Sequence, residues 1–210
     1  VTDPPYGLGF MGKGWDHGVP GVEFWTKFLQ AAKPGAHLLA FGGTRTHHLL
    51  MCAIEDAGWE IRDCLGWLYA TGFPKSLDVG KAIDKAAGVR EVIGSSLPAA
   101  TAARQWAGWG TALKPAWEPI ILARKSLEGT VAQNVQKWGT GALNIEGCRI
   151  PAEKSMGWLG IASKGYSGGL DNSGPARPVE GRWPANLIHD GSEEAIKLFP
   201  KAGGGFGKRG

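Results

Sequence analysis

Residues 37–57, HLLAFGGTRTHHLLMCAIEDA, decide the expected fold class. The first five residues form a short, continuous apolar run that ends at two glycines, as in a strand buried on both faces. Residues 45–57 then carry apolar side chains at helical spacing, with Thr44 as the expected N-cap and Gly58 as the stop. This stretch therefore predicts a strand that leads through a glycine turn into a helix.

The segments on either side continue this alternation. Further apolar patterns predict helices at residues 22–33 and 77–87 and strands at residues 59–69 and 117–125. Helices and strands that alternate with short connections are typical of an open α/β sheet. Ligands of such sheets gather where strands end and loops begin.

Composition places the chain among globular proteins of the cytoplasm. Hydrophobic residues make up 43% and charged residues 20%, and we find neither a bilayer-spanning apolar run nor a signal-peptide pattern. The three cysteines (Cys52, Cys64 and Cys148) form no C-x-x-C pair, which argues against disulfides and zinc. The histidines have no metal-ligand spacing, so we predict no metal. A net charge of +4 mildly favours a polyanionic partner.

Residues 128–210 are predicted to form a separate, irregular module. They are rich in Gly, Trp, Arg and Lys, with strand-like pieces at 142–150 and 183–189 and a helical pattern at 192–199. Most of the tryptophans are expected in the core. Because the sequence starts without Met and ends in a glycine-rich run, we expect it to be a piece of a longer chain.

The first residues carry an unusual elbow, Asp3-Pro4-Pro5-Tyr6. Val1 and Thr2 would end a strand, and the two prolines then fix φ and keep Asp3 extended. Residues 7–12 satisfy G-x-G-x-x-G, but no strand runs directly into them and the next helical pattern starts only near residue 22. We therefore reject the dinucleotide fingerprint and expect the loop to bend closely around whatever the elbow holds.

Such an elbow suits the recognition of a nucleobase. An extruded base offers two faces for stacking and an edge for hydrogen bonds. The Tyr6 ring can stack, and Asp3 or the Pro4 carbonyl can accept hydrogens from an exocyclic amine. Accepting these hydrogens localises the lone pair of a poorly nucleophilic nitrogen, so catalysis would depend on positioning and electrostatics.

At these residues the chain resembles S-adenosylmethionine-dependent amino-methyltransferases of DNA, in particular the β-group subset common in phages and prophages. The resemblance covers most of residues 1–150 and is carried by DPPY, FGGTRTHH, AGWEIRD, GWLYATGFPKSLD and WEPIILARK, in this order. It implies an incomplete Rossmann-like methyltransferase sheet with helices on both faces, S-adenosylmethionine as methyl donor and double-stranded DNA as partner.

The resemblance also assigns roles to the elbow. Asp3 would contact the target amine near the methyl donor, Pro4 and Pro5 would shape the elbow, and Tyr6 would stack on the flipped base. Asp in the first position suggests adenine N6, and cytosine N4 stays open. Residues 1–127 would be the catalytic half, with a variable insertion at about 77–115, and residues 128–210 the target-recognition module and linker.

One departure bears on activity. The family's donor-binding F-x-G-x-G motif, which should follow the recognition region, is absent from this sequence. We therefore expect the complete protein to methylate DNA and the 210-residue piece to be inactive alone. Basic and hydroxyl side chains are the expected DNA contacts: Arg45, Lys75, Ser76, Arg149, Lys164, Arg177 and Arg182.

Two other classes of function fit the elbow. A non-catalytic nucleic-acid-binding module could keep it as a base-stacking clamp. A related elbow also occurs in enzymes that methylate RNA bases or glutamine side chains. A glutamine enzyme would more typically have Asn at position 3 and would need no basic recognition module.

Overall fold

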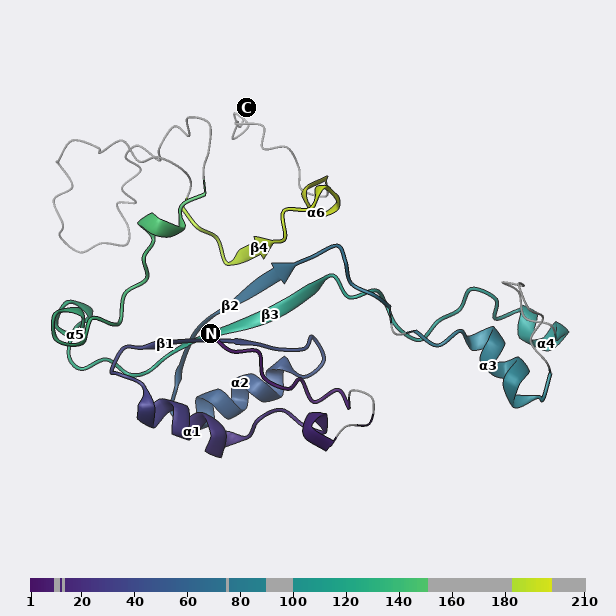
Figure 1. Ribbon diagram of the computed structural model, residues 1–210, viewed down its shortest axis with the longest axis horizontal. Coiled ribbons are helices and arrows are strands. Elements are labelled where there is room, and N and C mark those ends of the chain that lie inside the picture. Colours follow the sequence, from purple (N-terminus) through teal and green to yellow (C-terminus); the bar gives the residue numbers. More distant parts are fainter. Residues whose placement is uncertain (10–11, 13, 75, 90–99, 151–182, 198–210) are drawn as a thin grey trace, which may run out of the picture. The chain divides into compact units, whose positions relative to one another are not determined.

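A sheet with the strand order β1-β3-β2-β4 organises the computed structural model of this protein (Figure 1). The structure describes residues 1–9, 12, 14–74, 76–89, 100–150 and 183–197. The strands are β1 (His37–Phe41), β2 (Glu60–Leu68), β3 (Trp117–Arg124) and β4 (Leu187–His189). The helices are α1 (Val22–Ala31), α2 (His47–Asp56), α3 (Val79–Ala86), α4 (Thr101–Arg104), α5 (Val131–Trp138) and α6 (Glu193–Lys197), with 3-10 turns η2 (Gly14–Asp16) and η3 (Glu146–Cys148).

The described chain divides into two compact units. Unit 1 comprises Val1–Gly66 and Pro119–Ile188, and unit 2 comprises Trp67–Glu118 and His189–Gly210. The predicted division into a catalytic half and a recognition module at residue 127 stays a prediction. None of the described helices is long and apolar enough to cross a membrane.

β1 and β3, which are neighbours in the sheet, are antiparallel. β1 pairs with β3 in a register that runs from His37 opposite Arg124 to Phe41 opposite Ile120. Thr2 pairs with β1 in the parallel direction: its N–H donates to the Leu39 carbonyl (2.9 Å), and its carbonyl accepts from the Phe41 N–H (3.0 Å). The chain therefore reaches Asp3 at the carboxyl end of β1. Val1 and Thr2, expected to end a strand, contribute an isolated bridge through Thr2.

The core of unit 1 lies between the sheet and two helices on one of its faces. Alternate residues of β1 and β3 point to this face, and Trp25 of α1 and Ile54 of α2 pack against them with no exposed surface. The Trp25 indole N–H donates to the Pro20 carbonyl (3.0 Å), and the Trp59 indole N–H donates to the Trp25 carbonyl (3.1 Å). Both buried indoles are thus satisfied, which burial requires. α1 and α2 share one side of the sheet (Figure 1).

Most predicted elements are confirmed, with small corrections. The helices expected at 22–33, 45–57, 77–87 and 192–199 and the strands at 37–41, 59–69 and 117–125 all occur, apart from residues 198–199, which lie outside the described residues. A second helix layer on the opposite face of the sheet stays a prediction. The strand buried on both faces is β3, where residues 119–123 are all buried, whereas burial alternates along β1.

Two expectations for residues 128–150 were wrong. This region contains α5, which begins with a reciprocal cap between Thr130 and Gln133 and ends at Gly139 with φ +71°. Residues 142–150, expected as a strand, instead contain the 3-10 turn η3. Val131, Val135 and Trp138 do recur at helical spacing, but this signal was overlooked, and the residue that α5 buries is the polar Asn134.

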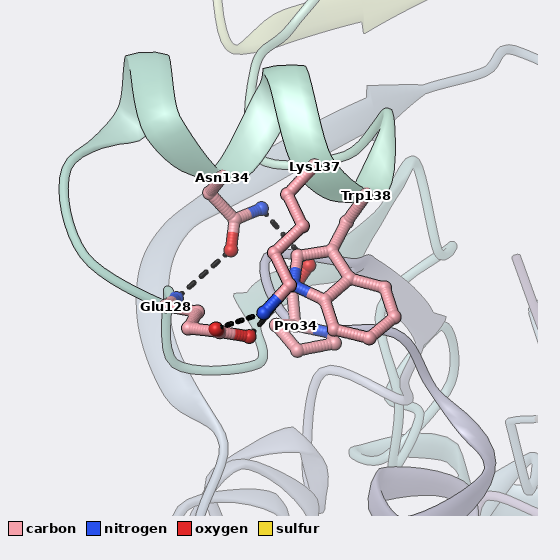
Figure 2. Close-up of polar contacts among 5 residues, drawn as sticks. All are labelled: Pro34, Glu128, Asn134, Lys137 and Trp138. Atoms are coloured by element: carbon pink, nitrogen blue, oxygen red, sulfur yellow. Dashed lines mark hydrogen bonds and ion pairs between the residues drawn. The ribbon is translucent and has the colours of Figure 1, made fainter.

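Asn134 is completely buried and joins α5 to the connection between α1 and β1 (Figure 2). Its side-chain oxygen accepts from the Glu128 N–H (2.9 Å), and its amide group donates to the carbonyls of Pro34 (3.0 Å) and Thr140 (2.8 Å). The Glu128 carboxylate in turn accepts from Lys137 and from the Trp138 indole N–H. Polar contacts therefore hold α5 against the rest of unit 1.

Unit 2 contains α3 and α4, which pack against each other. Asp78 caps α3 by accepting from the Lys81 N–H (3.0 Å) and bridges Gly110 in an antiparallel pair. The buried Asp84 accepts from the Ala100 N–H (3.1 Å). The tryptophans correct one expectation: Trp25 and Trp59 are buried, but Trp15, Trp106, Trp109, Trp117 and Trp183 are all exposed. Of these exposed rings, Trp106 and Trp109 pack edge to face against each other, with their centroids 5.2 Å apart.

Candidate functional site

The elbow starts where the parallel pairing of Thr2 with β1 ends. Asp3 is exposed, Pro4 is buried, and Pro5 and Tyr6 are half-buried. Two prolines in succession restrict the backbone here. The elbow therefore holds the Asp3 carboxylate in solvent and the Tyr6 ring partly against the protein, at the edge of the sheet where β1 ends.

The loop between β1 and α2 lies directly against the elbow. The Thr46 hydroxyl donates to the Tyr6 carbonyl at 2.6 Å. A Cβ at Gly43 would lie 3.3 Å from Cδ2 of the Tyr6 ring and 3.2 Å from the Thr46 hydroxyl, closer than ordinary van der Waals contact. Glycine at this position thus allows the loop to approach the ring.

This contact corrects the expected helix cap. The sequence predicted Thr44 as the N-cap of the second helix, but α2 begins at His47 with Thr46 in the N-cap position. The Thr46 side chain makes no cap hydrogen bond, because its hydroxyl is directed to Tyr6 instead. Thr is a residue type that normally caps a helix, but here the Thr46 side chain holds the backbone of the elbow at Tyr6.

The glycine-rich loop after the elbow folds back onto itself around Asp16. The Gly7 N–H donates to the Asp16 carboxylate (2.7 Å), and the Gly9 N–H donates to the Asp16 carbonyl (2.8 Å). Gly7 has φ +67°, and a Cβ there would come within 2.9 Å of backbone atoms of Gly18 and Val19. Gly7 therefore requires glycine for both its backbone conformation and its surroundings.

The rejection of the dinucleotide fingerprint agrees with this geometry. Residues 14–16 form the 3-10 turn η2, and α1 begins only at Val22. The fingerprint would place a helix start at its last glycine, Gly12. The loop instead closes on a buried carboxylate within its own turn.

The predicted DNA contacts lie in different parts of the chain. Arg45 is exposed in the loop beside the elbow. The Arg149 side chain is 15% exposed, donates to Glu146 (2.8 Å) and lies over the Trp183 ring (5.5 Å to its centroid). Ser76 belongs to unit 2, where its hydroxyl accepts from the Thr111 N–H (2.9 Å). The remaining predicted contacts lie outside the described residues: Lys75, Lys164, Arg177 and Arg182.

Three residues of this site were not predicted to belong to it: Asp16, Gly43 and Thr46. Their roles depend on contacts made through space, to residues 9 and 40 positions away for Asp16 and Thr46. The sequence pointed to Thr44, two residues before Thr46, and only as a helix cap. Among the described residues no group of three or more His, Cys, Asp or Glu side chains could hold a metal ion.

The arrangement can bind and orient a planar group that carries an amine. The exposed Asp3 carboxylate is an acceptor, and the half-buried Tyr6 ring is a stacking surface fixed from behind by Gly43. Of the two carboxylates described around the elbow, Asp3 is exposed and Asp16 is buried against the Gly7 N–H. These residues fit the base side of a methyl-transfer site.

Comparison with known proteins points in the same direction. No family model matches the chain. Over 127 residues, or 59% of the chain, it is 28% identical to the Type II methyltransferase M.HindIII of Haemophilus influenzae. The matched region spans 38% of the length of that relative. The chain is thus similar, over part of its length, to a Type II methyltransferase.

Proposed function

We propose that the protein carrying this chain is a DNA methyltransferase that moves a methyl group from S-adenosylmethionine to the N6 amine of adenine. The observation that carries the proposal is the position of Asp3-Pro4-Pro5-Tyr6 at the carboxyl end of β1, where α/β sheets bind their ligands. The similarity to a Type II methyltransferase supports the reaction class. Adenine is proposed because Asp stands first in the elbow.

The Tyr6 ring would hold the target base outside the duplex. A base inside the double helix presents neither face, so an enzyme acting on its amine must first extrude it. Gly43 lies close to one side of the ring, and the Thr46 hydroxyl holds the backbone carbonyl of Tyr6. A ring held in this way stacks on a base without first having to be ordered.

Asp3 would act on the amine itself. The carboxylate is exposed three residues before Tyr6, so it can accept an N–H of the stacked base. That hydrogen bond localises the nitrogen lone pair and stabilises the positive charge that develops on nitrogen as the new bond forms. When bound, S-adenosylmethionine supplies a methyl group on a positively charged sulfur, which leaves as a neutral thioether. The nitrogen finally loses one proton.

The proposal is tested by removing the Asp3 carboxylate from the full-length protein. We expect Asp3→Ala to reduce the transfer of labelled methyl groups to unmethylated genomic DNA by at least about 100-fold, since one lost charge-stabilising group costs roughly 10²–10³ in kcat. DNA affinity should stay close to wild type, because only the amine contact is removed.

A matched variant controls for the loss of a surface carboxylate. Asp56 is exposed at the end of α2, so Asp56→Ala should transfer methyl groups at the wild-type rate. If Asp3→Ala also transfers at nearly the wild-type rate, Asp3 has no part in the chemistry and the role given to the elbow is wrong.

A further inference from the structure

We infer that Asp16 and Thr46 are positioning residues that clamp the peptide group between Tyr6 and Gly7 and so aim the Tyr6 ring at the target base. The inference rests on the proposed function, because it concerns how the same elbow is held. It assigns a role to two side chains, neither of which the elbow motif contains.

Both hydrogen bonds end on one peptide group. The Thr46 hydroxyl donates to the Tyr6 carbonyl oxygen (2.6 Å), and the N–H of the adjoining Gly7 donates to the Asp16 carboxylate (2.7 Å). The carbonyl of residue 6 and the N–H of residue 7 belong to the same planar unit. Anchoring its two polar ends fixes the rotation of that plane, and with it ψ of Tyr6 and φ of Gly7.

The clamp acts where the chain would otherwise be loosest. Gly7 has φ +67° and could not carry a side chain, because a Cβ would lie 2.9 Å from the Gly18 carbonyl carbon. Glycine has the widest choice of backbone conformations, so a glycine directly after the stacking ring weakens the ring's orientation. The two side-chain hydrogen bonds restore the restraint that glycine lacks.

Burial of Asp16 argues that its hydrogen bond to Gly7 matters. Asp16 lies in a glycine-rich loop, yet it is only 3% exposed. Burying a carboxylate is unfavourable unless hydrogen bonds compensate it, and hydrogen bonds to a charged acceptor are the strong ones. Asp16 also fixes the next turn through its carbonyl, which accepts from the Gly9 N–H (2.8 Å).

Substitutions at both anchors of the full-length protein test the clamp. Thr46→Val removes the donor at nearly constant volume, and Asp16→Ala removes the acceptor. We expect each to lower kcat for methyl transfer to unmethylated genomic DNA roughly 10- to 100-fold, because small misplacements of reacting groups cost rates of this order. The KM for DNA should stay near wild type in both variants, and so should the thermal midpoint of Thr46→Val. Asp16→Ala should lower the midpoint, because the Gly7 N–H loses its acceptor.

Conservative variants separate positioning from folding. Thr46→Ser keeps the hydroxyl and should restore kcat, and Asp16→Asn keeps an acceptor oxygen and should fall between wild type and Asp16→Ala. Thr26 on α1 makes a comparable contact, from its hydroxyl to the Val22 carbonyl (2.9 Å), so Thr26→Val is the matched control and should leave kcat unchanged.

Two results would overturn the clamp while the proposed function stands. In one, the wild type transfers methyl groups and both Thr46→Val and Asp16→Ala retain kcat within about twofold. In the other, Thr46→Val lowers both kcat and the thermal midpoint and raises KM, and Thr46→Ser restores none of them, which would make the Thr46 side chain purely structural. A wild-type protein that transfers no methyl group to DNA would overturn the proposed function itself.

Discussion

Tyr6 is the residue whose proposed role depends most on the shape of its side chain. Its ring lies against Gly43, and its carbonyl is held by Thr46. If the ring serves to stack, Tyr6→Phe should methylate DNA almost as well as wild type. Tyr6→Ala should lose roughly 1–3 kcal/mol of base–aromatic stacking, which is about 5- to 150-fold in kcat/KM.

Steady-state kinetics of the full-length variants on unmethylated genomic DNA measure this difference. Gly43→Ala adds a methyl group against the same ring and should also lower kcat/KM, since a Cβ there would meet Cδ2 of Tyr6 at 3.3 Å. Equal defects in Tyr6→Phe and Tyr6→Ala would show that the hydroxyl group, and not the ring face, is what the reaction needs.

Single residues of the site were predictable when their chemistry was local. Asp3, Pro4, Pro5 and Tyr6 are consecutive, so their types alone indicated a stiff elbow with a carboxylate and a ring. Asp16 and Thr46 were not predictable, because a sequence does not show which backbone group a distant side chain will reach. The sequence predicted the helix cap at Thr44, whereas Thr46 occupies the N-cap position and its hydroxyl donates to the Tyr6 carbonyl instead.

At the scale of elements, α5 depends on a polar anchor. Asn134 has no exposed surface and bonds to Glu128, Pro34 and Thr140. Asn134→Ala leaves these buried backbone groups without that partner, and an unsatisfied buried group costs about 1–3 kcal/mol. We expect the free energy of unfolding to fall by at least about 2 kcal/mol.

Denaturant unfolding of the full-length protein measures this loss. Asn144 provides the control, because it is exposed and its side chain accepts one hydrogen bond, from the Gly147 N–H (2.9 Å). Asn144→Ala should cost less than about 1 kcal/mol, the size of an ordinary net hydrogen bond. Losses of similar size in the two variants would contradict the view that Asn134 anchors α5.

Helices whose apolar residues are buried were predicted, and α5, which buries a polar residue, was missed. α1 and α2 carry buried apolar residues at helical spacing, among them Trp25, Leu50 and Ile54. In α5, Val131 and Val135 are also at helical spacing, but they are exposed and the buried residue is Asn134. This spacing and the reciprocal cap of Thr130 and Gln133, with glycine at 139, were both visible in the sequence.

For the molecule as a whole, His37 makes stability depend on pH. His37 faces Arg124 across the β1–β3 pair, and burial, followed by the charge of Arg124, lowers the pKa of its imidazole below the ordinary 6.5. The unfolded chain then binds a proton at a higher pH than the folded protein does. Stability should therefore decline as the pH falls below 6.5 towards the lowered folded pKa.

Denaturant midpoints measured at about pH 7.5 and about pH 5.5 test this. Both pH values lie above the ordinary pKa values of carboxylates, so Asp and Glu contribute little to the difference. The decline between the two should be smaller in His37→Gln than in wild type. It should be unchanged in His48→Gln, which removes an exposed histidine of α2. A His37→Gln protein with the full wild-type decline would show that other groups cause it.

The architecture of the molecule was predictable only in outline. An apolar run such as residues 37–41 does not show whether its neighbouring strand is parallel or antiparallel. Its antiparallel pairing with residues 120–124 could therefore not be predicted from the sequence. Residues 88–115 carried little periodicity, because α4 is one short turn of helix whose buried residue is Ala103. Contacts between distant segments decide both features.

Digestion of methylated DNA to nucleosides, followed by mass spectrometry, decides whether the elbow is the site of base methylation. Unmethylated DNA is incubated with the full-length protein and S-adenosylmethionine carrying a labelled methyl group. Our account predicts labelled N6-methyl-2′-deoxyadenosine with wild type and Asp56→Ala, and almost none with Asp3→Ala. Label in N4-methylcytosine would correct the base but keep the elbow. No labelled nucleoside with the wild type, or equal amounts with wild type and Asp3→Ala, would contradict the account.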